Sequence, residues 1–416
     1  MKNLPHGRML WTLSLLCCGA LACTLTITIR ADWENPTAGI ARPYSEKRLP
    51  AAGTEIPTPT PRPTETPRPV ETPTASPTPE SASDCTHPFW SESVPDGARA
   101  RLEHFIVFDL AVSPDGRYFA AAGLEGDWGS CAVIVALYRT DDLVEAWTYY
   151  AGGDMIEEIE FSPDGSRLAA AVHSGSVRLI DTATGKPAGS WENNLDEYSS
   201  DVSWSPDGAF LAVGVSNASA VLWDAGNGTP NRTLGGNPAH TPESHSEPCY
   251  LDWSPDGTRI AVGTDRGRIH IFDPLSGRSL LSFSSGVFPG NADQIDWTGY
   301  LTALAWSPDG KTLAAGSQTE VDLWNPQSGE IRRTLRGHAS TVTALAWSAD
   351  GRRLASGDGY YNDDGTVIVW DADAGTIVRK LQGHKGFFVT AVAWMMDGQT
   401  VLSGSIDGSL ILWNAG

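Results

Sequence analysis

Short runs in which apolar and polar residues alternate recur along most of the chain, separated by residues that favour tight turns. Residues 301–306 (Leu-Thr-Ala-Leu-Ala-Trp) and 313–316 (Leu-Ala-Ala-Gly) are two such runs on either side of one turn. A period of two is typical of a half-buried β-strand, and two such runs joined by a few residues that include glycine predict a hairpin. The pattern therefore predicts a series of β-hairpins.

The turn between these runs is the tetrapeptide Ser-Pro-Asp-Gly, which occurs five times, with two further altered copies. Proline presets φ at the second position, aspartate can bond its own backbone, and glycine takes the left-handed conformation at the exit. The seven copies occupy residues 113–116, 162–165, 205–208, 254–257, 307–310, 348–351 and 395–398. Their starts lie 41 to 53 residues apart, which predicts an array of like units.

Each hairpin is followed by a third run that often ends in Trp-Asp or Trp-Asn, as in 321–325 and 367–371. A fourth run comes next, as in 331–335 and 377–381. Four strands in each of seven units predict an all-β fold, a seven-bladed β-propeller with four-stranded antiparallel blades.

The seventh unit lacks a fourth strand, because the sequence stops at Gly416 directly after the third one. The segment 98–103, just ahead of the first unit, has the pattern of the fourth strand in the other units. An open ring would leave a long unpaired edge that favours aggregation. We therefore expect residues 98–103 to complete the blade formed by 389–414 and to close the ring.

The last two units resemble the WD-repeat propellers in the order of four side chains. The two sets are His338, Ser356, Asp364 and Trp370 in the sixth unit, and His384, Ser403, Asp407 and Trp413 in the seventh. The resemblance implies that each set forms a hydrogen-bonded tetrad with a structural role. The first five units depart from this pattern, which leaves other propellers with the same turn, such as the TolB-like ones, as an alternative.

The N-terminal end predicts export. Residues 9–29 are an uncharged and largely apolar run between Arg8 and Arg30, long enough to cross a bilayer as one helix. Positive charge precedes the run and acidic residues follow it, so the positive-inside rule places residues 1–8 in the cytoplasm and the rest outside.

Two other kinds of processing fit the same region. Residues 19–23 (Gly-Ala-Leu-Ala-Cys) are an imperfect lipobox-like site that would leave a lipidated Cys23, and 29–31 would suit an ordinary signal peptidase. All three interpretations place the propeller outside the cytoplasm. With a membrane-spanning helix or a lipidated Cys23, the protein would stay at the cell membrane as a single-pass or lipid-anchored protein. The chain thus resembles an exported, membrane-tethered bacterial member of the WD-repeat family.

Residues 57–80 contain nine prolines and seven threonines. Such a composition cannot bury a core and favours the extended polyproline II form. We therefore expect a disordered Pro/Thr-rich stalk over 30–84, followed by the propeller domain over 85–416.

Charge and motifs narrow the function. The formal net charge of −21 argues against nucleic-acid binding, which needs a surface rich in lysine and arginine. No phosphate loop, Gly-x-Ser-x-Gly elbow or His-Glu-x-x-His occurs, so we expect no enzyme activity and no cofactor. A propeller enzyme or a ligand sensor that uses the central channel is the alternative.

Two loops carry groups able to bind metals, but neither predicts a metal site. The spacing in 240–249 fits no standard zinc site, and in 358–365 Asp364 already has its expected structural role. Three cysteines lie outside the apolar run. Of these, Cys85 and Cys131 flank the first blade and are the preferred disulfide pair.

Long insertions occur only in connections expected on one face of the ring, and several carry aromatic side chains. These are Trp128, Phe288, Trp297, Tyr300, Tyr360, Tyr361, Phe387 and Phe388. Exposed aromatic residues on loops are enriched in protein interfaces. The sequence thus predicts a non-enzymatic interaction scaffold that binds a protein or peptide on this face.

Overall fold

Every regular element that the computed structural model describes is a β-strand. The described residues are 89–91, 93–103, 105–125, 132–152, 154–192, 199–215, 219–235, 249–264, 267–284, 301–360 and 363–416. They all belong to the second of two units into which the chain divides, Ala82–Gly416.

The strands form seven antiparallel sheets, six of them with four strands in chain order. Blades 1 to 3 are β3 (Phe105–Val112), β4 (Tyr118–Glu125), β5 (Val133–Arg139) and β6 (Glu145–Gly152); β7 (Ile156–Phe161), β8 (Arg167–Val172), β9 (Ser176–Asp181) and β10 (Pro187–Glu192); and β11 (Ser199–Trp204), β12 (Phe210–Val215), β13 (Ser219–Asp224) and β14 (Thr229–Gly235). Blades 4 to 6 are β15 (Cys249–Trp253), β16 (Ile260–Thr264), β17 (Arg268–Phe272) and β18 (Ser279–Ser284); β19 (Ala303–Trp306), β20 (Leu313–Gly316), β21 (Glu320–Asn325) and β22 (Glu330–Arg336); and β23 (Val342–Trp347), β24 (Arg353–Asp358), β25 (Thr366–Asp371) and β26 (Thr376–Gln382).

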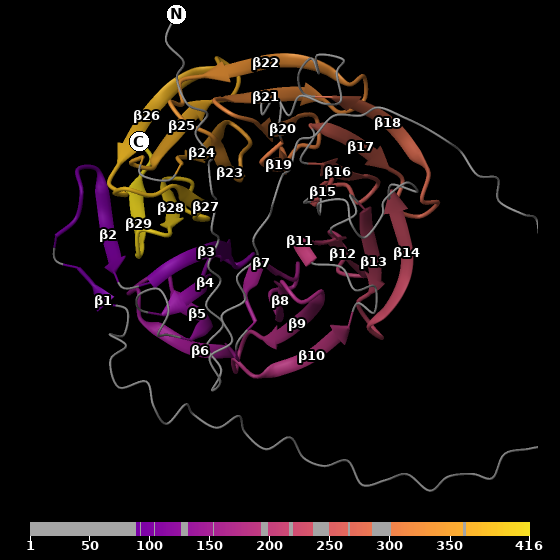
Figure 1. Ribbon diagram of the computed structural model, residues 1–416, viewed down its shortest axis with the longest axis horizontal. Helices are drawn as coiled ribbons and strands as arrows, with labels where there is room; N and C mark the ends of the chain where they lie inside the picture. Colours follow the sequence, from indigo (N-terminus) through magenta and orange to yellow (C-terminus); the bar gives the residue numbers. More distant parts are fainter. Residues whose placement is uncertain are drawn as a thin grey trace, which may run out of the picture. The chain divides into compact units, whose positions relative to one another are not determined.

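The sheets stand around a ring, with the first strand of each blade nearest the centre (Figure 1). Each of these inner strands contacts the inner strand of the next blade, and β27 of blade 7 contacts β3 of blade 1. The predicted seven-bladed propeller is therefore confirmed.

Blade 7 is completed by a strand from ahead of the ring. It contains β27 (Val389–Trp394), β28 (Thr400–Ser405), β29 (Ser409–Asn414) and β2 (Ala98–Glu103). In Figure 1 the indigo β2 lies beside the yellow β29, and the register places Leu102 opposite Leu410. The predicted closure by 98–103 is thus confirmed.

A fifth strand on blade 7 was not predicted. Strand β1 (Phe89–Trp90) pairs with β2, so that Trp90 lies opposite Leu102. The Trp90 indole meets the Tyr138 ring edge-on, with 6.0 Å between ring centroids. The segment ahead of β2 therefore reaches across to blade 1 and covers the seam where the ring closes.

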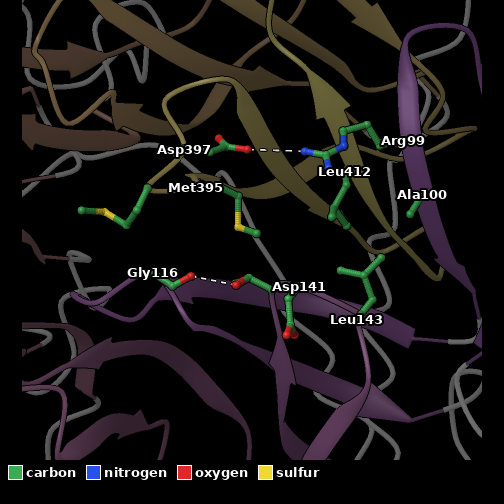
Figure 2. Close-up of a pocket in the computed structure, with 10 residues that line it drawn as sticks. Arg99, Ala100, Gly116, Asp141, Leu143, Met395, Asp397 and Leu412 are labelled. Atoms are coloured by element: carbon green, nitrogen blue, oxygen red, sulfur yellow. Dashed lines mark hydrogen bonds and ion pairs between the residues drawn. The ribbon is translucent and has the colours of Figure 1, made fainter.

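The altered turn Met395–Gly398 lies at the same seam. It lines a hollow of about 260 Å³ together with residues of β2 and of blade 1, shown in Figure 2. Arg99 of β2 lies 3.4 Å from Asp397. Met396 packs so close to Gly116 that a Cβ on that glycine would lie 2.7 Å from the methionine Cβ. Gly116 is thus required both by its positive φ and by this contact.

The repeated turns have the predicted chemistry. In the first copy, the Ser113 hydroxyl donates to Asp115 at 2.7 Å and accepts from the Tyr118 N–H at 2.9 Å. The bond from the Arg117 N–H is the largest contribution that lowers the pKa of Asp115, to about 2. Each hairpin is therefore closed by an ionised aspartate.

Tryptophans that precede the turns join neighbouring blades. In four of them the indole N–H donates to a backbone carbonyl on the inner strand of the preceding blade, at 3.0 to 3.3 Å. The pairs are Trp204 with Glu160, Trp306 with Asp252, Trp347 with Ala305 and Trp394 with Ala346. These tryptophans therefore bond neighbouring blades to one another.

Several predictions fall on the N-terminal part of the chain. The apolar run 9–29, Cys23, the stalk 30–84 and both preferred disulfide partners, Cys85 and Cys131, lie outside the described residues. Within the described residues, no helix has the length and apolar character needed to cross a membrane.

Candidate functional site

Blade 7 contains a buried chain of four side chains. His384 lies on the connection from β26 to β27, and its Nε2 is 2.7 Å from the Ser403 hydroxyl. The Trp413 indole N–H donates to the same hydroxyl at 2.7 Å. The other nitrogen of the His384 imidazole, Nδ1, lies 3.2 Å from the Asp407 carboxylate. These four side chains link the connection between blades 6 and 7 to strands β28 and β29.

Asp407 remains ionised inside this blade. Burial by itself would raise the pKa of its carboxyl, but hydrogen bonds from His384, the Ser409 hydroxyl and the Lys385 N–H outweigh burial and lower the pKa. The carboxylate thus holds the start of the connection, at Lys385, against the blade.

Blade 6 has a comparable arrangement with a different aspartate. His338 Nε2 lies 2.5 Å from the Ser356 hydroxyl, to which Trp370 also donates at 2.7 Å. The carboxylate beside His338 is that of Asp358, 2.8 Å from Nδ1. Asp364, predicted for this role, is instead half exposed and contacts Lys385 Nζ at 2.7 Å.

The prediction of Asp364 was therefore wrong, for a structural reason. The connection between the second and third strands is longer in blade 6 than in blade 7. The residue six positions before the tryptophan is Asp407 in blade 7. In blade 6 the same spacing selects Asp364, which lies inside the longer connection. Asp358, at the end of β24, is the residue that lies in the blade, where it also accepts from the Thr366 N–H at 2.8 Å.

The earlier blades differ, as their sequences indicate. In blades 3 and 5, Trp223 and Trp324 are buried, but among the described residues no partner accepts their indole N–H. They pack instead on aromatic rings, with 5.8 Å between the centroids of Trp223 and Trp191 and 4.6 Å between those of Trp324 and Phe283.

The two histidine connections lie beside an insertion and form one surface region. We define the blade 6–7 loop sector as residues 337–341, 358–360, 363–365 and 383–388. Its segments are bonded to one another: the Gly359 N–H donates to Thr341 at 3.0 Å, and the Gly365 N–H donates to Phe387 at 3.1 Å. Asp364 accepts from the Gly386 N–H at 2.9 Å. These bonds hold the exposed connections in place.

Three of the predicted partner-binding aromatics lie in this sector. Tyr360 is 59% exposed, whereas Phe387 and Phe388 are half-buried. Gly359, at φ 141°, packs directly on the Phe388 backbone. The other five predicted residues, Trp128, Phe288, Trp297, Tyr300 and Tyr361, lie outside the described residues.

A second hollow lies at the ring axis. It has a volume of about 510 Å³ and is lined by the inner strands of all seven blades. Asp109, Glu158, Glu160 and Asp252 line it, and sequence reasoning missed this group. The available signal was their position, since each lies two or four residues before the first residue of a turn.

Among the described residues that line the axial hollow, none is a histidine. Within the described part of the chain, no three His, Cys, Asp or Glu side chains are placed to hold a metal ion.

Comparison with known families agrees with the fold. The family model described as "WD domain, G-beta repeat" matches residues 187–224, 236–273, 286–325, 329–371 and 375–414. A second model, described as "Anaphase-promoting complex subunit 4 WD40 domain", matches residues 128–200. These matches include blades 2 to 5, which lack the complete tetrad.

Curated proteins similar to this chain include three from eukaryotes. They are Autophagy-related protein 16 of Arabidopsis thaliana (29% identical over 165 residues, 35% of this chain and 31% of that protein), Protein HIR1 of Gibberella zeae (24% over 356 residues, 74% and 33%), and Guanine nucleotide-binding protein subunit beta of Saccharomyces cerevisiae (31% over 157 residues, 36% and 31%). The chain spans about a third of the length of these relatives.

Proposed function

The chain belongs to the WD40-repeat family, and we propose that it is a non-enzymatic scaffold whose blade 6–7 loop sector binds a protein or peptide. One relative is by its name a subunit of a larger protein, in keeping with such a role. Fold alone does not choose the binding surface, whereas the geometry of the sector itself favours one.

The observation that carries the proposal is the anchoring of this sector. His338 and His384 each belong to one of its connections and are bonded to buried serines of the blade beneath. An exposed aromatic held by such a support loses little conformational entropy on binding, which favours affinity. Tyr360 is the described side chain that best meets this condition.

The test is partner capture with the full-length chain as bait from solubilised membranes. Replacing Tyr360 by serine should remove bound partners that the unmodified chain retains. Tyr150 on the outer strand β6 is 45% exposed, so Tyr150→Ser is the matched control and should retain them. Equal capture by both variants, with equal thermal unfolding, would rule out the sector as the binding surface.

The same proposal includes a location outside the cytoplasm, with the membrane reached through the N-terminal segment. Its support is the uncharged run 9–29 with Arg8 before it and acidic residues after it. Protease added to intact cells should cleave the propeller, whereas protection until the cells are opened would contradict export. Incorporation of labelled fatty acid that Cys23→Ser abolishes would identify the lipid-anchored form.

The enzyme alternative gains little from the axial hollow. Carboxyl groups do line it, but each of the four accepts a hydrogen bond from a backbone N–H of the next blade. This arrangement favours a structural role for the acids.

A further inference from the structure

The inner strands fall into two groups, which differ in the residue types at the positions two and four residues before the first residue of each turn. In blades 5, 6 and 7 all of these positions are alanine. In blades 1 to 4 five of them are acidic: Asp109 in β3, Glu158 and Glu160 in β7, Asp201 in β11 and Asp252 in β15. One side of the ring axis is therefore acidic and the other apolar.

Each of these acids joins its blade to the next one. The bonds run from the N–H of Ile159 to Asp109 at 2.8 Å, Val202 to Glu158 at 3.3 Å, Trp204 to Glu160 at 2.6 Å, Leu251 to Asp201 at 2.8 Å and Trp306 to Asp252 at 2.6 Å. The inner strand is an edge of its sheet, so the backbone groups along its channel side have no strand partner. The carboxyl groups satisfy these donors at four successive seams.

The other seams use neutral groups. The Thr390 hydroxyl donates to the Val107 carbonyl at 2.8 Å, across the seam between blades 7 and 1. Thr302 and Thr343 make the corresponding bonds to the carbonyls of Val342 and Val389. A hydroxyl donor does not titrate in the physiological range, so these three seams are independent of pH.

No described cation faces the acids. The axial hollow has no lysine, arginine or histidine in its lining, and the remaining inner strands contribute only uncharged residues, Leu304, Ala305, Leu345 and Val392. The nearest charged groups are thus the acids themselves. After burial, the neighbouring Asp201 carboxylate is the next cause that raises the pKa of Glu158.

Four of the five carboxyl groups keep their protons to unusually high pH. Enclosure by the ring penalises the charged form and raises the pKa of Asp109 and of Asp252 to about 7, although backbone N–H bonds act in the opposite direction. The pKa values of Glu158 and Glu160 are raised well above the ordinary range by the same burial and by neighbouring carboxylates. A protonated carboxyl still accepts a hydrogen bond through its carbonyl oxygen.

We infer that the carboxyl-bonded seams of blades 1 to 5 form an acid-stabilised half-ring, which is tight when these groups are protonated and loosens as they lose their protons. In the unfolded chain the same residues ionise near pH 4. The folded chain therefore binds more protons between about pH 4 and 7, and its stability falls as the pH rises through that window. This behaviour is separate from partner binding by the loop sector.

The first test is thermal unfolding of the full-length chain in detergent, near pH 5 and near pH 8. We expect a midpoint lower by about 5 °C or more near pH 8. The difference should persist in about 0.5 M NaCl, because salt screens exposed charges far more than enclosed ones. A midpoint that is constant or higher near pH 8, or a difference abolished by salt, would overturn the inference.

A variant pair assigns the effect to the half-ring. Glu160→Gln combined with Asp252→Asn keeps an acceptor for the Trp204 and Trp306 N–H groups and removes the titration. This variant should lose about half of the pH dependence or more and unfold at a higher temperature near pH 8. Asp309→Asn, in an exposed turn where the pKa of the aspartate is lowered, should keep the full dependence. The same dependence in both variants would overturn the assignment.

Proton uptake provides a measurement that needs no variant. Titration of the native chain and of the chain in guanidinium should show at least about two additional protons bound to the native form between pH 5 and 7. Superimposable titration curves would overturn the inference even if the double variant failed to fold.

Discussion

The Trp90 indole N–H donates a hydrogen bond to the Leu143 carbonyl oxygen at 2.9 Å. Trp90 belongs to β1, ahead of the ring, whereas Leu143 lies between β5 and β6 of blade 1. Because β1 also pairs with β2, the same short segment is bonded to both sides of the seam. The N-terminal side of the ring thus contributes one strand and one tryptophan hydrogen bond to the closed seam.

Trp90→Ala should lower the free energy of unfolding by about 2 kcal/mol, below the cost for a fully buried tryptophan because Trp90 is only half-buried. Trp90→Phe retains a ring against Tyr138 but loses the bond to Leu143, and should cost about 1 kcal/mol. Denaturant unfolding measures both values. Equal stability of all three proteins would show that the tryptophan does not secure the seam.

The closing strand itself offers a sharper contrast. Leu102 is 1% exposed and lies opposite Leu410, so Leu102→Ala should cost about 2–5 kcal/mol. Arg99 in the same strand is exposed, and its ion pair with Asp397 should contribute less than about 1 kcal/mol. Light scattering should also detect association of the Leu102 variant, because loosening β2 exposes an unpaired edge. If Arg99→Ala destabilised the chain more than Leu102→Ala, apolar closure would be contradicted.

Substitutions of Asp358 and Asp364 distinguish the tetrad observed in blade 6 from the one predicted by spacing. Asp358→Ala removes the carboxylate beside His338 and leaves the Thr366 N–H without its acceptor, so we expect a loss of about 2–3 kcal/mol. Asp364→Ala, an equal change in volume at an exposed site, should cost less than about 1 kcal/mol. Urea unfolding of the two variants decides between them. A larger loss from Asp364→Ala would restore the assignment made from spacing.

The blade 7 tetrad predicts that the folded chain loses stability at low pH. Since the pKa of Asp407 is lowered in the folded chain, its contribution is present above about pH 4 and is lost as the pH falls through the folded value. The turn aspartates, such as Asp115 with a pKa of about 2, act in the same direction. Together with the half-ring, this places maximal stability between about pH 4 and 6.

Asp407→Asn should therefore flatten the fall in thermal midpoint below pH 4, relative to the unmodified chain. The midpoint near pH 8 should fall as well, because the amide cannot replace the charge beside His384. An unchanged acid limb would show that Asp407 does not contribute to it. Asp141→Asn, at an exposed site with 81% of its side chain accessible, is the control and should leave the whole profile unchanged.

Local chemistry explains what could be predicted. A Ser-Pro-Asp-Gly turn between alternating runs needs no distant partner to form, so its seven copies specify seven hairpins. The missing last strand then required a segment with a matching pattern, and 98–103 supplied it. In blade 7 the short connection preserves the spacing from Asp407 to Trp413, so the tetrad partners could be named from the sequence.

Tertiary structure decided the features that depend on distant segments meeting. The role of Asp358 depends on how a longer connection leaves β24, and spacing along the chain does not record that path. Trp90 follows no repeat, and its partners Tyr138 and Leu143 are near it only because the ring closes. The acids at the axis are separated by up to 143 positions in sequence, from Asp109 to Asp252. They become one group only when the inner strands surround a common channel, where enclosure raises the pKa values of Asp109, Glu158, Glu160 and Asp252.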